Sequence, residues 1–131
     1  MEHLLYRSRA SENFDPGQVF TIIQTSARRN PGRDVTGFLA FAHGTFVQLV
    51  EGPAEALDGL LGDLRNDGRH CELEVLERRP IERRRFPEWR MERLAVGDGD
   101  ASRLEERLRE AGIEPATIRT VLETYRCAKA A

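Results

Sequence analysis

Apolar and polar residues alternate at the start of the chain and then change to a helical spacing. Within residues 3–7, Leu4 and Tyr6 fall on one side of a pleated segment, which predicts a strand with Tyr6 facing the same side as Leu4. Asp15 and Pro16 form a helix start, because aspartate can cap free amides and proline at the first helical position gives up no needed donor. A helix is therefore predicted over residues 16–29.

That helix should have an apolar stripe and end near an amide side chain. At 3.6 residues per turn, Asn30 falls within about 20° of Val19 around the helix axis, so the helix directs Asn30 toward the core side. The stripe itself consists of Val19, Ile22, Ile23 and Ser26.

Two further apolar runs, residues 35–42 and 45–51, read as strands joined by a turn at His43 and Gly44. This pattern predicts a hairpin. On its second strand Phe46, Gln48 and Val50 share one face, so a primary amide lies in the middle of an apolar row.

A second helix is predicted from Gly52 and Pro53 to about residue 66, and strands are predicted over 72–80 and 89–96. The element order is then βαββαββ. Helices between strands that cover one face of the sheet indicate an α+β, ferredoxin-like sandwich with the other face open. The stripe of the second helix consists of Leu57, Leu60, Leu61 and Leu64.

Residues 101–111 and 115–128 have the spacing of two amphipathic C-terminal helices, which could cover the open face. The predicted domains are therefore a sandwich over residues 1–97 and a helical extension over 98–131. The extension carries more apolar residues than one sheet face needs, which predicts a homo-oligomer, with a monomer capped by both helices as the alternative. These residues are Leu104, Leu108, Ile118, Val121, Leu122 and Tyr125.

Composition narrows the function without identifying it. The chain has 131 residues, 40% of them hydrophobic and 32% charged, which suits one globular domain without a membrane span. The N-terminus has no secretory pattern, so a cytoplasmic location is expected. A net charge of −2 argues against direct nucleic-acid binding. Cys71 and Cys127 form no CxxC motif and are expected to be reduced thiols.

An arginine cluster departs from this balanced charge. Such a cluster could bind an anion or an acidic partner, or it could be a solvated strand edge whose charges discourage edge-to-edge pairing. The second interpretation is favoured. The cluster consists of Arg78, Arg79, Arg83, Arg84 and Arg85.

Common catalytic motifs are absent from the sequence: it contains no P-loop, GxGxxG, HExxH or GxSxG. His3, His43 and His70 do not have metal-ligand spacing, so they are interpreted as surface histidines. We therefore expect neither an enzyme nor a metal site.

Tyr6, Asn30 and Gln48 are all predicted to point into the space between the sheet and the first helix. Taken singly, Tyr6 could be a core tyrosine with its hydroxyl at the surface, and Gln48 could pair with backbone. Leaving such a buried group unpaired costs about 1–3 kcal/mol, so three of them together favour a polar, largely flat ligand in that space.

The chain resembles the BLUF family, sensors of blue light using FAD. The segments that carry the resemblance are LLYRSRA, TSARRNPGRDVTG, GTFVQLVEGP, DGRH and PIERRRFPEWRM, in order and covering about residues 3–96. The resemblance implies an isoalloxazine ring between the two helices, with Ile22 and Leu64 packed on it. It also implies that Asn30 bonds the ring's carbonyl and imide edge and that Gln48 bridges Tyr6 to the flavin.

Further contacts around the ring and ribityl chain are implied for Arg29, Asp67, Arg69 and His70, and a state-reporting pair for Trp89 and Met91. Arg29 and Asp63 depart from residues common in the family, so FMN or riboflavin are alternatives to FAD. The implied photochemistry is electron transfer from Tyr6 with a proton following through Gln48. Signalling would then pass through the fifth strand and the C-terminal helices to a separate effector protein or another copy. The alternative function is a flavin-free ferredoxin-like interaction module.

Overall fold

The computed structural model describes residues 1–10, 35–42, 44–66, 70–86, 92–95 and 101–130. The helix predicted over residues 16–29 lies outside these ranges.

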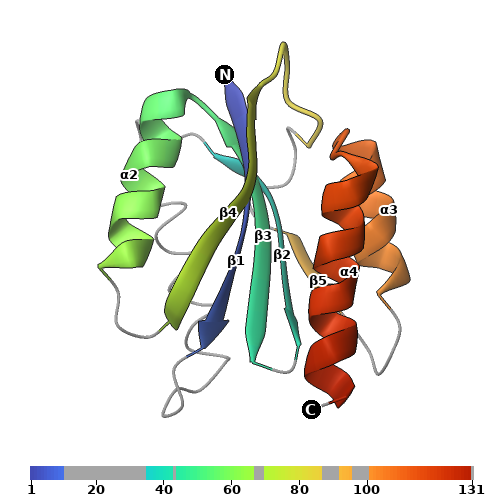
Figure 1. Cartoon of the computed structure of the whole chain (residues 1–131). Helices are drawn as coiled ribbons and strands as arrows, with labels where there is room; N and C mark the ends of the chain where they lie inside the picture. Colours follow the sequence, from blue (N-terminus) through green and yellow to red (C-terminus); the bar gives the residue numbers. More distant parts are fainter. Residues whose placement is uncertain (11–34, 43, 67–69, 87–91, 96–100, 131) are drawn as a thin grey trace.

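A mixed sheet forms the centre of the described structure (Figure 1). Its strand order is β4-β1-β3-β2-β5. Strand β5 pairs with β2 in parallel, and the other neighbours pair antiparallel. The strands are β1 (Glu2–Ala10), β2 (Thr36–Ala42), β3 (Thr45–Gly52), β4 (His70–Pro80) and β5 (Glu92–Ala95).

Strands β1 and β3 are central because their side chains can be buried on both faces. Every residue of β3 is buried, and Leu4, Leu5 and Tyr6 of β1 are 0% exposed. Strand β4 lies at an edge of the sheet and is more polar. Its register against β1 shifts between Leu5 and Tyr6 and again between Arg7 and Arg9, as expected where a bulge interrupts a ladder.

Two glycines allow the hairpin to form. Gly44 has φ +77° at the turn between β2 and β3, a conformation that other residues rarely adopt. Gly37 on β2 has φ +152°, and a Cβ there would clash with the carbonyl oxygen of Leu49 on β3. Glycine at position 37 therefore lets the two backbones approach.

Helix α2 (Ala54–Arg65) covers one face of the sheet. It begins after Pro53, whose carbonyl accepts from the amides of Ala56 and Leu57 at 3.0 and 3.1 Å. The predicted leucine stripe packs onto a first core with Leu4, Tyr6, Val35, Leu39, Phe46 and Val50. Full burial of each such leucine contributes about 1.5–3 kcal/mol.

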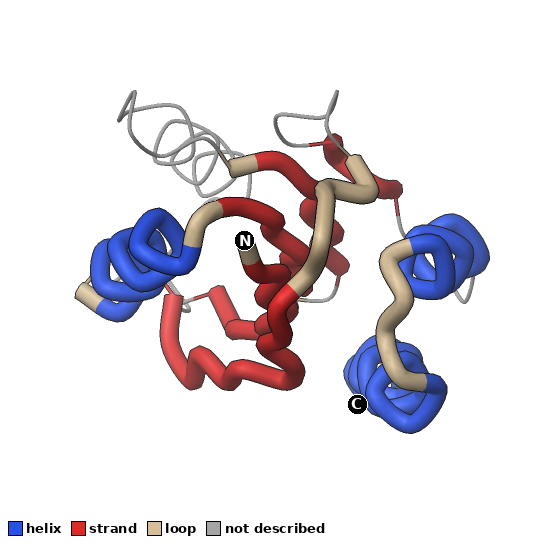
Figure 2. The backbone as a smooth tube through the Cα atoms, turned by 90° about the horizontal axis from the view of Figure 1, so that it is seen from above, coloured by secondary structure: helices blue, strands red, loops and turns tan. Residues whose placement is uncertain are grey.

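Helices α3 (Ser102–Glu110) and α4 (Pro115–Ala130) cover the opposite face. Seen from above, α2 and the α3/α4 pair lie on opposite sides of the strands (Figure 2). The second core joins Leu104, Leu108, Ile118, Val121 and Tyr125 to Leu5, Phe38, Ala40, Val47 and Leu49 of the sheet.

The α+β, ferredoxin-like prediction is confirmed. The one-face coverage by α2 and the closure of the second face by the C-terminal helices agree with it. The six apolar residues that predicted self-association are used within the chain, however, because five of them are buried and Leu122 is half-buried against the second core. Self-association itself stays a prediction.

Candidate functional site

Tyr6 and Gln48 meet in the middle of the first core. They stand directly opposite each other in the register of β1 and β3, and both are 0% exposed. The Tyr6 hydroxyl donates a hydrogen bond to Oε1 of Gln48. The two central members of the predicted polar trio are therefore in contact.

The surroundings of this pair are apolar. Leu4, Leu39 and Phe46 come from the sheet, and Leu60 and Leu64 from α2. Burial raises the pKa of Tyr6 well above the ordinary tyrosine value, because the phenolate would lose its hydration. Tyr6 is accordingly a neutral hydrogen-bond donor at neutral pH.

Most other predicted site residues fall outside the described ranges. Leu64 is placed in the first core at 2% exposure, and His70 is placed on β4 by its backbone. The predictions for Ile22, Arg29, Asn30, Asp67, Arg69, Trp89 and Met91 all lie outside the described residues.

Glu51 is an important residue that the sequence pattern did not reveal. It ends the apolar run of β3 and is 0% exposed. Its carboxylate accepts hydrogen bonds from the backbone amides of Arg85 and Phe86, at 2.6 and 2.7 Å. Arg84 also donates to the Glu51 carbonyl, at 2.8 Å. Glu51 therefore fixes the segment that leads into Trp89 and Met91, and an acidic residue ending an apolar strand was its only signal.

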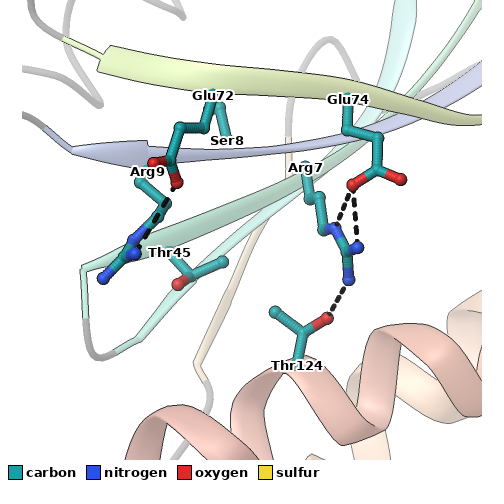
Figure 3. Close-up of a pocket in the computed structure, with 7 residues that line it drawn as sticks. All are labelled: Arg7, Ser8, Arg9, Thr45, Glu72, Glu74 and Thr124. Atoms are coloured by element: carbon teal, nitrogen blue, oxygen red, sulfur yellow. Dashed lines mark hydrogen bonds and ion pairs between the residues drawn. The ribbon is translucent and has the colours of Figure 1, made fainter.

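Arg7, the residue after Tyr6, connects the sheet with α4 on the second face (Figure 3). Its Nη1 donates to Thr124 Oγ1 at 2.6 Å, while Nε and Nη2 donate to Glu74 at 3.0 and 2.8 Å. These residues line a pocket of about 390 Å³, at whose far side Arg9 pairs with Glu72 at 3.6 Å. Sequence patterns did not reveal this link, because its members are remote along the chain.

The interpretation of all three histidines as surface residues is wrong for His3. It is 1% exposed, and its Nε2 lies 2.8 Å from Glu77. The side chain is buried because β1 is a central strand whose second face is covered. His43 and the side chain of His70 lie outside the description.

The structure places the members of the arginine cluster in two different settings. Arg78, on the edge strand, pairs with Glu2 at 2.8 Å and Asp58 at 2.7 Å, so its charge is bound within the chain and not simply solvated. Arg84 is also bound internally, to Thr36 at 3.0 Å. Arg79, Arg83 and Arg85 line a cleft instead.

Comparison with known families decides which class of domain this is. Residues 1–92 match the family described as sensors of blue-light using FAD. The chain belongs to the BLUF family. The resemblance noted in its sequence is thereby confirmed, and with it the class of function: a flavin-dependent blue-light sensing domain.

Curated relatives of this BLUF chain are larger proteins. One is the photoactivated adenylate cyclase subunit beta of Euglena longa, 36% identical over 87 residues, which are 66% of this chain and 10% of that protein. Another is the blue light- and temperature-regulated antirepressor BluF of Escherichia coli, 34% identical over 67 residues, 51% of this chain and 17% of that protein. The chain thus spans about a tenth of the length of the cyclase.

A solved structure of comparable size is BlrB, a BLUF protein in its dark state. It is 30% identical, with a TM-score of 0.65, and the match covers 98% of this chain and 95% of that one. The likeness therefore extends through α3 and α4. Among the described residues, no helix is long and apolar enough to cross a membrane.

The described residues of this BLUF domain fit a flavin. An isoalloxazine ring is flat and apolar with one polar edge, and the first core offers aliphatic side chains around a single amide and phenol. Because an amide carries a donor and an acceptor at opposite ends, Gln48 can bond Tyr6 through Oε1 and direct its amino group elsewhere.

Proposed function

We propose that this BLUF domain is a blue-light receptor in which Tyr6 and Gln48 form the switch beside a bound flavin. The observation that carries the proposal is the hydrogen bond from Tyr6 to Oε1 of Gln48 within a wholly buried apolar layer. FAD is the proposed cofactor, and FMN and riboflavin are the alternatives.

Gln48 and Leu64 are the described residues that would hold the flavin ring, together with Ile22 and Asn30. Arg29, Asp67, Arg69 and His70 are proposed to contact its remaining part. When bound, the flavin supplies an excited state that is a strong one-electron oxidant.

Tyr6 can respond because its proton already has an acceptor. Loss of an electron makes a phenol strongly acidic, so the proton leaves along the existing hydrogen bond to Oε1 of Gln48. Return of the electron and proton then leaves the Gln48 amide rotated or tautomerised. Rotation exchanges donor and acceptor at constant shape, which glutamate or leucine could not do. The altered hydrogen bond red-shifts the absorption of the domain slightly.

The proposed output passes through β5 and the C-terminal helices, with Trp89 and Met91 reporting the state of Gln48. Contacts across the second face support a route to α4. Arg7, adjacent to Tyr6 in β1, bonds Thr124, and the Tyr125 hydroxyl donates to the Ala40 carbonyl at 3.3 Å. In this division, residues 1–97 sense light, and residues 98–131 act on a separate effector protein or a second copy.

The decisive experiment is absorption spectroscopy of the purified protein before and after blue light. The wild-type protein should carry oxidised flavin and show a small, reversible red shift. Extraction and chromatography of the pigment identify it as FAD, FMN or riboflavin. A colourless protein that also fails to bind any of the three when they are added would refute the proposal.

Three variants test the roles of the switch residues. Tyr6→Phe and Gln48→Leu should each retain flavin and lose the red shift, since each removes one hydrogen-bonding member of the pair. Tyr125→Phe is the matched control, because Tyr125 is the only other tyrosine and belongs to the opposite core. A normal photocycle in Tyr6→Phe or Gln48→Leu would contradict the assigned roles.

Asn30→Ala tests the proposed contact with the ring edge. It should weaken flavin binding or shift the dark spectrum, because it deletes a direct hydrogen bond to the ring. Flavin affinity and dark spectrum both equal to those of the wild type would remove Asn30 from the site.

Self-association is tested separately by light scattering of the full chain in darkness and under blue light. A dimer or larger species in either state supports a second copy as partner. If the chain is a monomer at micromolar concentration in both states, self-association is refuted and the proposed partner is a separate effector protein.

A further inference from the structure

A cleft of about 790 Å³ lies on the side of the sheet away from the Tyr6–Gln48 pair. One wall is the segment after β4, which carries Arg83 and Arg85, and the other is the turn between α3 and α4 at Ala111 and Gly112. These two segments come together at the end of the molecule that holds the N-terminus (Figure 1).

The cleft is positively charged. Arg79, Arg83 and Arg85 line it, against a single lining carboxylate, Glu82. Arg79 is held in place by Glu77 at 3.1 Å and by the Gly112 carbonyl. The guanidinium groups of Arg83 and Arg85 have no hydrogen-bond or ion-pair partner within the part of the chain that the structure describes. Two planar donor groups are thus available at the mouth of the cleft.

A buried polar atom gives an independent indication of a ligand. His3 also lines the cleft, is 1% exposed, and has no hydrogen-bond partner for its Nδ1 among the described residues. Its Nε2 lies 2.8 Å from Glu77, so Nε2 carries the proton that the carboxylate accepts. In the neutral ring Nδ1 is then a buried acceptor without a donor, an arrangement that usually requires an explanation.

We propose that this cleft binds a phosphate group through Arg83, Arg85 and Nδ1 of His3. Hydrogen phosphate has bare oxygens that accept from guanidinium donors and a hydroxyl that can donate to Nδ1. One ligand can therefore satisfy both the free donors and the unpaired acceptor. Arginine suits this task because its planar fork can bond two oxygens at once.

The site is distinct from the flavin site. His3 and Leu5 alternate with Leu4 and Tyr6 along β1, and Leu5 belongs to the second core while Tyr6 belongs to the first. Phosphate binding in darkness is therefore independent of the photochemistry, and the two proposals can fail separately.

Isothermal titration of the dark, flavin-loaded protein with inorganic phosphate tests the proposal. At about 0.15 M NaCl, which screens weak surface attraction, we expect a dissociation constant of about 1 mM or lower. Sulfate has the same shape but no hydroxyl at neutral pH, so it should bind at least several-fold more weakly. Glycerol phosphate is mostly a dianion without a phosphate hydroxyl at neutral pH, so it should also bind more weakly than free phosphate, and equal affinity for the two would remove Nδ1 from the site.

Charge-matched variants locate the binding. The double variant Arg83→Gln/Arg85→Gln should weaken phosphate binding by about 10- to 100-fold, the loss expected for charged hydrogen bonds. Arg103→Gln/Arg119→Gln removes the same charge from exposed positions of α3 and α4 that do not line the cleft, and should bind as the wild type does. If both double variants weaken phosphate binding equally, the affinity depends only on the net charge of the protein, and the proposal is overturned.

Nitrogen NMR of the imidazoles gives a readout that needs no substitution at the buried His3. Saturating phosphate should shift the Nδ1 resonance of His3 and leave Nε2, bonded to Glu77, much less changed. A Nδ1 resonance that does not move at saturation, or sulfate binding as tight as that of phosphate, would overturn the assigned site.

Discussion

Glu51→Gln should destabilise the protein, because a single buried carboxylate holds the segment between β4 and the Trp89 region. Both carboxylate oxygens are in use: Oε2 accepts from the Arg85 amide at 2.6 Å, and Oε1 accepts from the Phe86 amide at 2.7 Å. Glutamine has nearly the same shape. It keeps one acceptor and places an amino group where the other acceptor was.

The expected loss follows from these two bonds. One buried amide is left facing another donor, which costs about 1–3 kcal/mol, and the retained bond becomes neutral and weaker by about 1 kcal/mol. Relief from burying a charge at 0% exposure offsets part of this. The net decrease in the free energy of unfolding is therefore about 1–3 kcal/mol for Glu51→Gln. Glu51→Ala should lose more, because both amides are left without an acceptor.

Urea unfolding in darkness, followed by far-ultraviolet circular dichroism and by flavin absorption, measures this loss. Glu55→Gln is the matched control, because Glu55 lies exposed in the first turn of α2 and should change stability by less than about 0.5 kcal/mol. If Glu51→Gln unfolds at the wild-type urea concentration with an unchanged slope, the carboxylate does not anchor this segment.

Three further predictions follow from the packing. Gly37→Ala should lower the free energy of unfolding, measured in urea, by about 2–5 kcal/mol, because its Cβ would clash with the Leu49 carbonyl. Gly62→Ala is the control: its Cβ meets nothing within 4 Å, so stability should change by about 1 kcal/mol or less. Equal effects of the two substitutions would contradict the close approach of β2 and β3. Burial raises the pKa of both tyrosines, Tyr6 and Tyr125, so ultraviolet titration of the folded protein should show no phenolate at pH 10, their ordinary midpoint. Because the folded protein favours the neutral phenols, their contribution to stability is complete below about pH 10 and falls as the pH rises above it. Phenolate that appears at pH 10 while the fold is intact would refute the burial of the tyrosines. In light scattering and urea unfolding, a chain ending at residue 97 should aggregate or unfold without cooperativity, because the second core loses every α3 and α4 side chain. A truncated chain that is monomeric and unfolds cooperatively would show that the sheet does not need these helices.

The sequence alone was sufficient for elements whose signal is local. The alternation of apolar and polar residues predicted that Tyr6 shares a face with Leu4, and Gln48 with Phe46 and Val50. The four apolar and aromatic residues of this set belong to the first core, and Gln48 accepts a hydrogen bond from Tyr6 there. The leucine spacing of α2 needed no tertiary information, since one side of a helix recurs every 3.6 residues. Long motifs in order were likewise enough to indicate the BLUF family.

Only the tertiary structure decided which remote residues meet. Pairing β1 with β3 sets Tyr6 opposite Gln48, and a register shift of one residue would have turned one of them to the other face. The central position of β1, with α3 and α4 over its second face, buries His3, although a histidine two residues from the N-terminus carries no local signal of burial. The bonds of Glu51 to residues 85 and 86 and of Arg7 to Thr124 span long stretches of chain. Periodicity describes only the faces of single elements, whereas such partners are chosen by strand order and by the need to pair every buried polar group.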